Sequence, residues 1–353
     1  MLIGISIGCL TDLRTLTPLN RLDQTMKRTS KSKLFALFVC LSTAIIPSLA
    51  NAQSAAIRES DLATFEPRLI GPAVTGGRIH NLAALPDNPS VIFIASASGG
   101  LWKTTNRGHT WKNTFADQAV STFGDVTIAP SNSDIIYAGT GEQNNRQSTS
   151  WGNGVYRSND AGETWTHLGL TETRHIGKVV VDPTNPDVVY VAALGNLWQA
   201  SDERGVFRSV DGGQTWEKTL FIDDYTGAVD LVINPDNPHI LYAATYQRLR
   251  RTWGFNGGGP GSAIYKSEDA GETWIRLSNG IPRGDKGRIG LAISKSNPTT
   301  LNALIEHPDG NSQGTYRTED SGLNWIRVNS LNPRPMYYSK IFIDPSEPDR
   351  VYV

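Results

Sequence analysis

Hydrophobic and polar residues alternate along the chain in short runs, and turns rich in Pro, Asn, Asp and Gly separate these runs. In residues 178–218 the runs KVVVD, VVYVAA, GVFRS and TWEK follow one another, with PTNPD between the first two. β-Branched and aromatic residues favour strands, and proline–asparagine clusters favour tight turns. This stretch therefore predicts four short antiparallel strands and shows no helical period.

The same unit recurs along the chain. The string SNDAGETW at 158–165 joins the third strand of its unit to the fourth, and related strings occupy 104–111, 209–216, 267–274 and 318–325. The tryptophans that end the five strings are separated by 54, 51, 58 and 51 residues. A period near 50 with four strands per unit is typical of a β-propeller. We predict an all-β fold, a β-propeller of four-stranded antiparallel blades.

The recurring string predicts a structural corner between strands. Its acid can accept hydrogen bonds from its own turn, its glycine can adopt a positive φ, and its tryptophan can pack between blades. One acid per turn falls short of the oxygen ligands that calcium requires, so no metal and no cofactor is predicted. The residues assigned this structural role are Asp160, Gly162, Trp165, Asp211, Gly213, Trp216, Asp269, Gly271, Trp274, Asp320, Gly322 and Trp325.

The pattern S-x-D-x-G-x-T-W resembles the Asp-box, or BNR, repeat. It matches fully at Ser158, Ser209 and Ser267, whereas Asn106 replaces the acid in the first copy and Asn324 replaces the threonine in the last. Sialidases, xyloglucan hydrolases and sortilin-type receptors all carry this box. The spacing, the GGRI opening and the DPxxPDxVYV turns look most like bacterial exported proteins with a sortilin-type N-terminal propeller, which are often named BNR-repeat glycosyl hydrolases.

The two ends of the chain differ from the repeats. A basic segment from Met26, an apolar run of 13 residues ending at Ile46, and small residues at Ala50 and Ala52 are typical of a signal peptide cleaved after Ala52. Residues 337–353 repeat only the first half of a unit. We expect an upstream segment and signal peptide at 1–52, a linker at 53–66, and a propeller at 67–353 with five blades and half of a sixth. We further expect the propeller to continue in a longer polypeptide.

Charge and cysteine content narrow the classes of partner. Six of the 33 basic and two of the 34 acidic residues lie in 1–52, which leaves 27 basic and 32 acidic residues and a net charge of −5. Phosphate backbones require a positive field, so we expect no nucleic-acid partner. Cys9 and Cys40 both lie in the segment expected to be removed, so we expect no disulfide in an exported protein, periplasmic or extracellular.

Variable loops predict the location of the functional site. The turns between first and second strands and the Asp-box turns are short and uniform, whereas the loops at the other ends of the strands vary in length. Binding residues concentrate on variable loops of a rigid scaffold. The candidate ligand-binding residues on this loop face are Arg78, His175, Lys178, Trp151, Trp198, Arg248 and Trp253.

Alignment of the first strands predicts a ring of polar residues around the central channel. Each ring residue precedes an aliphatic residue. Because successive side chains of a strand point to opposite faces, the ring residues and the aliphatic residues lie on different sides of the first strands. The ring comprises Asn81, Asp125, Lys178, Asp230, Gly290 and Lys340. Mutual pairing and ligand contact are both open roles for it.

The sequence leaves three functions open. A glycosidase needs two carboxyl groups, and Asp125 and Glu142, in the same unit, are the catalytic candidates. Because no acid pair, metal-ligand spacing or nucleophile elbow is recognisable, we favour a non-catalytic module that binds protein, peptide or glycan. The alternatives are an Asp-box glycoside hydrolase, xyloglucanase-like or sialidase-like, and a structural domain of a larger exported protein.

Overall fold

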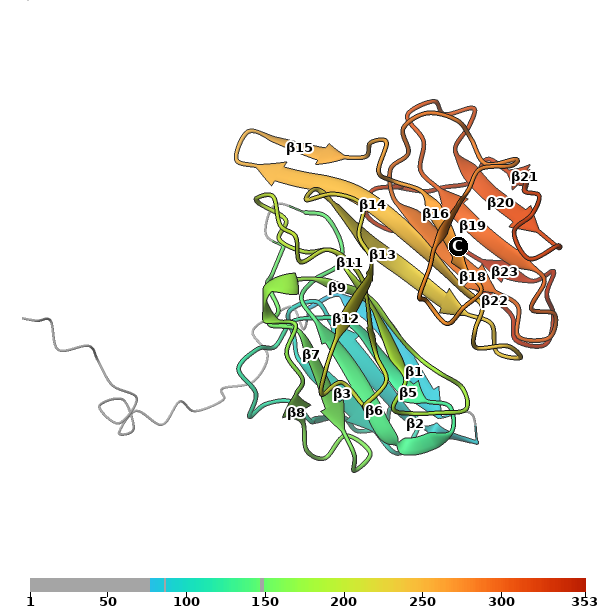
Figure 1. Ribbon diagram of the computed structural model, residues 1–353. Helices are drawn as coiled ribbons and strands as arrows, with labels where there is room; N and C mark the ends of the chain where they lie inside the picture. Colours follow the sequence, from blue (N-terminus) through green and yellow to red (C-terminus); the bar gives the residue numbers. More distant parts are fainter. Residues whose placement is uncertain (1–76, 86, 147–148) are drawn as a thin grey trace, which may run out of the picture. The chain divides into compact units, whose positions relative to one another are not determined.

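The computed structural model describes residues 77–85, 87–146 and 149–353 of the chain, and these residues form successive antiparallel sheets (Figure 1). Blade 1 holds β1 (Ile79–Leu85), β2 (Asn88–Ser96), β3 (Leu101–Thr104) and β4 (Lys112–Asn113). Blade 2 holds β5 (Phe123–Ala129), β6 (Asn132–Thr140), β7 (Val155–Ser158) and β8 (Thr166–His167). Blade 3 holds β9 (Ile176–Val181), β10 (Val189–Ala193), β11 (Gly205–Ser209) and β12 (Glu217–Leu220), with the short 3-10 helix η1 (Thr171–Thr173) before it.

The later units repeat this order. Blade 4 holds β13 (Thr226–Ile233), β14 (Leu241–Arg251), β16 (Ile264–Ser267) and β17 (Ile275–Leu277), and β15 (Gly254–Gly257) pairs with the long β14. Blade 5 holds β18 (Ile289–Ile293), β19 (Leu301–Ile305), β20 (Gly314–Thr318) and β21 (Ile326–Asn329). A last two-stranded sheet holds β22 (Phe342–Ile343) and β23 (Val351–Tyr352). In the described part of the chain, no helix is long and apolar enough to cross a membrane.

The blades meet through their first strands. β1 contacts β5, and the series continues through β9, β13, β18 and β22. Lys340, which lies just before β22, donates a hydrogen bond to the backbone carbonyl of His80 in β1. The predicted all-β propeller, with an incomplete last unit, is therefore confirmed, while the predicted signal peptide and linker lie outside the described residues.

The hydrophobic core lies between neighbouring blades, as the tryptophans of the repeat predicted. Trp165 of blade 2 is buried in a cluster of residues from blades 1 and 2, with its ring centroid 5.3 Å from that of Phe115. Trp216 of blade 3 donates its indole N–H to the carbonyl of Leu168 in blade 2, at 2.8 Å. Burying an indole in this way stabilises the fold by about 2–3 kcal/mol.

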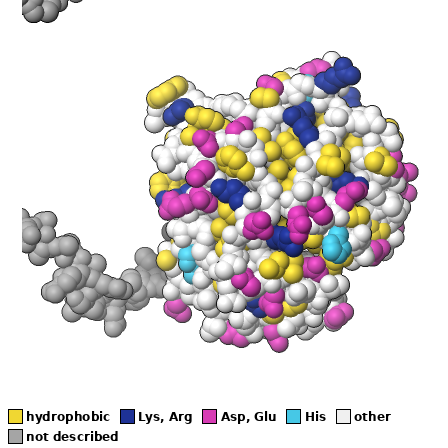
Figure 2. All heavy atoms as spheres, viewed as in Figure 1, with side chains coloured by type: hydrophobic (Ala, Val, Ile, Leu, Met, Phe, Trp, Pro, Cys, Tyr) yellow, Lys and Arg dark blue, Asp and Glu magenta, His cyan; other side chains and the backbone are white. Residues whose placement is uncertain are grey.

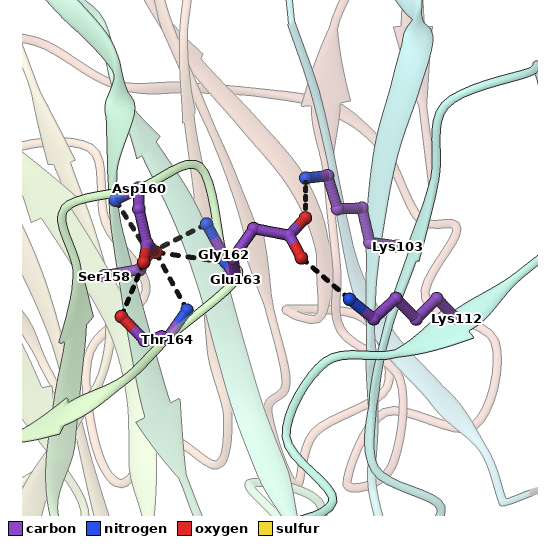
Figure 3. A network of polar contacts seen from close by, with 7 residues as sticks. All are labelled: Lys103, Lys112, Ser158, Asp160, Gly162, Glu163 and Thr164. Carbon is purple, nitrogen blue, oxygen red and sulfur yellow. Dashed lines mark hydrogen bonds and ion pairs between the residues drawn. The ribbon is translucent and has the colours of Figure 1, made fainter.

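The Asp-box corner satisfies its own polar groups (Figure 3). Oδ1 of Asp160 accepts hydrogen bonds from the Ser158 hydroxyl at 2.7 Å and from the Thr164 N–H at 2.8 Å, while Oδ2 accepts the Thr164 hydroxyl at 2.5 Å. The Gly162 N–H donates to the Ser158 hydroxyl at 2.7 Å. Both Ala161 and Gly162 have positive φ, of which only the glycine was expected from the sequence.

The two degraded boxes keep the same geometry. In blade 1, Asn106 Oδ1 accepts the Thr110 N–H at 2.9 Å, and its amide donates to the Thr110 hydroxyl. In blade 5, the amide of Asn324 replaces the threonine hydroxyl and donates to Asp320 Oδ2 at 2.7 Å. Hydrogen-bonding capacity at these positions therefore matters more than the exact residue type. Among the described residues, no group of three or more His, Cys, Asp or Glu side chains is placed to hold a metal ion.

Candidate functional site

The predicted polar ring lies around a cavity of about 300 Å³ on the inner strands. Its wall includes apolar residues of blades 4 and 5 as well as polar ones. The ring members that line it are Asn81, Asp125, Lys178, Asp230 and Lys340, and Gln143 and Arg288 join them. Register reasoning from the sequence thus placed five side chains, from blades 1 to 4 and from the segment before β22, around one cavity, whereas Gly290 of blade 5, the sixth predicted ring member, is not part of its lining.

The acids of this ring join neighbouring blades. Asp125 Oδ2 accepts the backbone N–H of Val179 in the next blade at 2.8 Å, and its Oδ1 lies 3.3 Å from Lys178 Nζ. Asp230 repeats the arrangement, because its Oδ2 accepts the Leu291 N–H of the following blade at 2.9 Å. Each acid follows a register shift in its own strand, which turns its side chain toward the neighbour. Blade joining is thus the role that the contacts of both acids describe.

Burial and charge shift the pKa values of the ring. Burial raises the pKa of Asp230, although Lys178 opposes this shift. Burial alone would lower the pKa of Lys178, but Asp125 and Asp230 raise it above its ordinary value. Burial, together with the neighbouring charges of Arg288 and Lys178, lowers the pKa of Lys340 to about 8. The cavity therefore holds a mixed set of charges whose protonation depends on one another.

The loop between β6 and β7 crosses from blade 2 to blades 4 and 5. Arg288 Nη2 donates to Gln143 Oε1 at 2.7 Å, and its Nη1 donates to Asn144 Oδ1 at 2.6 Å. Asn145 donates to the hydroxyl of Tyr246 at 2.6 Å, and Arg248 Nη1 donates to Asn145 Oδ1 at 2.8 Å. These side chains are buried, so the loop face carries a polar network that links residues more than 100 positions apart.

Asp125 and Glu142, the predicted catalytic candidates, do not share one open site. Asp125 lines the cavity, whereas Glu142 is fully buried outside its lining. Glu142 Oε1 lies 2.5 Å from Arg78 Nη2, and its Oε2 accepts the Ser150 N–H at 3.2 Å. Arg78, a predicted ligand-binding residue, is thus paired with this acid. Catalysis by Asp125 and Glu142 stays a prediction, and the contacts give both acids structural partners.

Two predicted ligand-binding residues are inaccessible from solvent. His175 and Arg248 are both fully buried, so neither side chain lies on the surface of the loop face. The reason is that β14 continues into a hairpin with β15, and this hairpin packs against the loop after β10 through a hydrogen bond from the Arg250 N–H to the Leu197 carbonyl, at 2.8 Å. Neither side chain can contact a large ligand approaching this face.

The three loop tryptophans differ in exposure. Trp253 lies in the β14–β15 turn, which extends beyond its sheet in Figure 1, and is 86% exposed. Trp151 is 52% exposed, and the guanidinium of Arg174 lies 5.2 Å from its ring centroid. Trp198 is half-buried in the loop after β10. Trp253 is therefore the indole most available for an external contact.

Glu306 is an acid of the loop face that the sequence did not pair with any other group. Glu306 follows β19, is half-buried, and accepts the Arg288 N–H through Oε2 at 2.8 Å. Burial raises the pKa of Glu306, despite the hydrogen bond and positive charge of Arg288. This contact could not be predicted from the sequence, because Glu306 and Arg288 are not close neighbours along the chain.

Figure 2 shows acidic and basic side chains interspersed on the viewed face, so that face has no broad basic surface of the kind that nucleic acids need.

Comparisons with known proteins agree with this architecture. A Sortilin-Vps10 family model, described as sortilin, neurotensin receptor 3, matches residues 153–283. The GH74 xyloglucanase of Xanthomonas campestris superposes with a TM-score of 0.58 at 18% identity, covering 77% of this chain and 43% of that structure. A GH74 enzyme of Niastella koreensis gives 0.56 at 19% identity, with the same coverages. The β-propeller fold and the resemblance to Asp-box proteins stated from the repeats are confirmed.

Curated relatives with similar amino-acid sequences are also xyloglucanases. A xyloglucanase of Paenibacillus sp is 26% identical over 252 residues, which cover 62% of this chain and 22% of the relative. A probable oligoxyloglucan-reducing end-specific xyloglucanase of Neosartorya fischeri is 29% identical over 208 residues, covering 57% and 22%. A xyloglucanase of Hypocrea jecorina is 24% identical over 298 residues, covering 74% and 34%. The chain therefore spans between about a fifth and a third of the length of these relatives.

These relatives overturn the preferred functional prediction. A non-catalytic module that binds protein, peptide or glycan was favoured because no acid pair was recognisable, but the relatives named above are all hydrolases. The similarity supports the glycoside hydrolase alternative instead. The physical reason for the error is that carboxyl groups from different blades can meet without any fixed spacing in the sequence.

Proposed function

We propose that the protein is a glycoside hydrolase that acts on a branched β-glucan of the xyloglucan kind. The observation that carries this proposal is the similarity to xyloglucanases over half or more of the chain, together with the shared propeller fold. Because the chain spans a minor part of those relatives, the activity is proposed for the protein as a whole.

Hydrolysis of a glycosidic bond requires a carboxylic acid that still holds its proton near neutral pH, and a second carboxylate. Glu306 fits the first role best among the described acids of the loop face. Burial raises the pKa of Glu306, and Oε1 has no hydrogen-bond partner among the described residues while Oε2 is anchored by the Arg288 N–H. An anchored carboxyl group with one free oxygen can hold a proton in a fixed direction.

The second carboxylate is sought at the neighbouring cavity. Arg288, whose backbone anchors Glu306, also lines the cavity with Asp125 and Asp230. Both aspartates already accept a backbone N–H from the next blade, so each combines a joining role with access to the cavity. A cavity of about 300 Å³ lies at the lower end of the range of small-molecule sites, which extends from roughly 300 to 1,000 Å³.

Aromatic residues supply the glycan contact in this proposal. A sugar ring presents an apolar face that an exposed indole can cover, and Trp253 offers its indole at the tip of the β14–β15 hairpin. Trp151 offers a second ring, supported from one side by Arg174. Both lie on the loop face, away from the Asp-box corners.

The experiment is an assay of reducing-end release from xyloglucan by the full-length protein, with unbranched cellulose as the comparison substrate. We expect release from xyloglucan and a loss of about 10²–10⁴-fold in kcat for Glu306→Gln. Glu268→Gln is the matched control, because this exposed glutamate lies within an Asp box, away from the loop face, and pairs with Lys266. Absence of release by folded protein contradicts the hydrolase proposal, whereas full activity of Glu306→Gln contradicts only the assignment of the acid.

We also propose that the protein is exported. The support is the basic segment, the apolar run and the small residues of 26–52. A polysaccharide substrate lies outside the cytoplasm, so export and the proposed activity are consistent with each other. Sequencing the N-terminus of the secreted or periplasmic protein tests this, and we expect it to begin after Ala52.

A further inference from the structure

One edge of a buried guanidinium on the loop face has no partner. Nη1 of Arg248 donates to the Gln143 carbonyl at 3.0 Å and to Asn145 Oδ1 at 2.8 Å. Nε and Nη2 of the same fully buried side chain have no hydrogen-bond partner among the described residues. These two nitrogens form the side edge of the guanidinium, whose parallel N–H groups bind one acceptor group with two hydrogen bonds.

Two more unpartnered groups belong to the same neighbourhood. His175 is fully buried and its ring nitrogens make no hydrogen bond of normal geometry in the described structure, although the backbone of Glu142 lies close enough to oppose the lowering of its pKa. Nε of Arg204 is also unpartnered. The Leu194 N–H donates to the His175 carbonyl at 2.8 Å, and the Leu194 carbonyl accepts Arg204 Nη1 at 2.7 Å. This places His175 and Arg204 on either side of Leu194.

The carbonyl of Tyr225 links this pair to Arg248. It accepts Arg204 Nη1 at 3.2 Å and the backbone N–H of Arg248 at 3.1 Å. Three segments, the loop before β9, the loop after β10 and strand β14, therefore meet here, and burial together with the charges of Arg248 and Arg204 lowers the pKa of the His175 imidazole. All three side chains are excluded from solvent.

The charge of this cluster is not balanced by protein groups in contact with it. Arg204, Arg248 and the nearby Arg288 are buried, and within the described residues none of them lies within 4.0 Å of a carboxylate oxygen. Glu142 is already engaged by Arg78 and the Ser150 N–H. Buried charges are costly unless an opposite charge accompanies them. Consistent with this, burial and the nearby Arg204 lower the pKa of Arg248 to about 9.

We propose that a small monovalent inorganic anion, chloride in the first instance, binds between the Nε–Nη2 edge of Arg248, the imidazole of His175 and Nε of Arg204. An anion supplies a hydrogen-bond acceptor for the unpartnered N–H groups and also the missing negative charge. A water molecule supplies only the acceptor. Complete burial of the three side chains restricts the ligand to an ion of this size. The anion ties blades 3 and 4 together beneath the loop face.

The first test uses bromide as a heavy analogue of chloride. Crystals of the full-length protein grown in sodium bromide are expected to show an anomalous scattering peak within hydrogen-bonding distance of Arg248 Nε and Nη2. Ordered water at this position, with no anomalous peak, overturns the proposal.

The second test is thermal unfolding in sodium chloride and in sodium gluconate at equal ionic strength. A ligand that binds only the folded state raises Tm, and we expect chloride to raise it by about 2–4 °C over gluconate. Arg248→Lys keeps a positive charge without the two-pronged edge and is expected to lose this difference. Arg251→Gln, on the exposed part of the same strand, is the control and is expected to keep it.

Equal Tm values of the unaltered protein in the two salts overturn the proposal, as does a chloride effect that Arg248→Lys retains. Should Arg248→Lys fail to fold, the bromide peak in the unaltered protein decides the question by itself. Neither measurement depends on glycan hydrolysis, so the anion site and the proposed enzyme activity are tested separately.

Discussion

The Asp-box corners lie at one end of the blades and the loop face lies at the other. Both connect strands, but their polar groups find hydrogen-bond partners in different ways. An Asp-box corner satisfies its polar groups within four residues of sequence, as Asp160 does with Ser158 and Thr164, and its acid is exposed. The loop face satisfies its polar groups across the molecule, as Arg288 does with Asn144, 144 residues away, and its network is buried. Local corners can be copied from blade to blade, whereas the loop network exists only once all of its blades are assembled.

Burial determines how much each kind of connection contributes to the free energy of unfolding. Exposed hydrogen bonds compete with water and contribute about 0.5–1.5 kcal/mol each, while a buried polar group that loses its partner costs about 1–3 kcal/mol. The corners therefore act as many small, independent contributions. The loop network acts as one large, cooperative contribution, and the predictions below separate these two behaviours.

The largest effect is expected for Arg288→Ala. The change removes buried hydrogen bonds to Gln143, Asn144 and the Tyr337 carbonyl, and leaves these groups without partners. We expect a loss of about 3–5 kcal/mol in the free energy of unfolding, measured by urea denaturation. Arg327→Ala is the matched control, because this exposed arginine donates to the Gln313 carbonyl and is expected to cost less than about 1 kcal/mol. Equal losses for the two variants contradict the comparison.

A smaller effect is expected for Gly162→Ala in the Asp box. Gly162 has φ +84°, and an added Cβ lies 2.6 Å from Phe93 of blade 1, so both backbone strain and a clash between blades result. We expect a loss of about 2–3 kcal/mol. Gly169→Ala isolates the strain, because Gly169 has φ +87° with no atom within 4 Å of the added Cβ, and about 1 kcal/mol is expected. Urea unfolding measures the loss of stability of each variant, and the difference between the two losses is the energetic cost of the clash with Phe93. Equal losses would contradict the expected clash.

The same comparison explains what the sequence could predict. Asp160 and its counterparts were found because their contacts lie at fixed spacing within a repeat, and even Asn106 and Asn324 fit that spacing. The ring residues Asn81 and Asp125 were found because strand register repeats as well. Periodicity thus gave the fold, the corners and the lining of the cavity.

The loop network could not be predicted in this way. Gln143 and Asn144 contact Arg288, and no rule of spacing joins positions more than 140 residues apart in loops of variable length. The run of amides at 143–145 was the one available signal, since consecutive amides that are buried need partners. The environment of Glu306 could not be predicted for the same reason, because it is created by Arg288 rather than by the sequence neighbours of Glu306.

The pH dependence of stability is expected to come from the corners. Hydrogen bonds from Thr164, and from the equivalent residues of three other boxes, lower the pKa of Asp160, Asp211, Asp269 and Asp320 from 3.8 to about 2. Each lowered pKa adds stability that is present above pH 3.8 and is lost as the pH falls through 2. We expect Tm to fall between pH 4 and pH 2.

The matched variant for this prediction is Asp160→Asn, which imitates the natural Asn106 of blade 1. An asparagine keeps the acceptor oxygen but does not titrate, so part of the pH-dependent fall in Tm is expected to disappear while Tm near neutral pH changes little. An unchanged pH profile in the variant would show that the acid transition arises elsewhere, for example from the lowered pKa of Glu163 beside Lys103.

The smallest effect on stability is expected for Trp253→Ala on the loop face. Because its indole is 86% exposed, its removal is expected to change the free energy of unfolding by less than about 0.5 kcal/mol. Trp165→Ala, at the interface between blades 1 and 2, removes a buried indole and is expected to cost about 3–5 kcal/mol. If Trp253 contacts glycan as proposed, its variant instead weakens the binding of a xyloglucan oligosaccharide about fivefold or more, measured by calorimetry. A folded Trp253→Ala that binds the oligosaccharide as tightly as the unaltered protein would place the glycan contact away from this hairpin, and Trp151 with Arg174 would be the next indole to test.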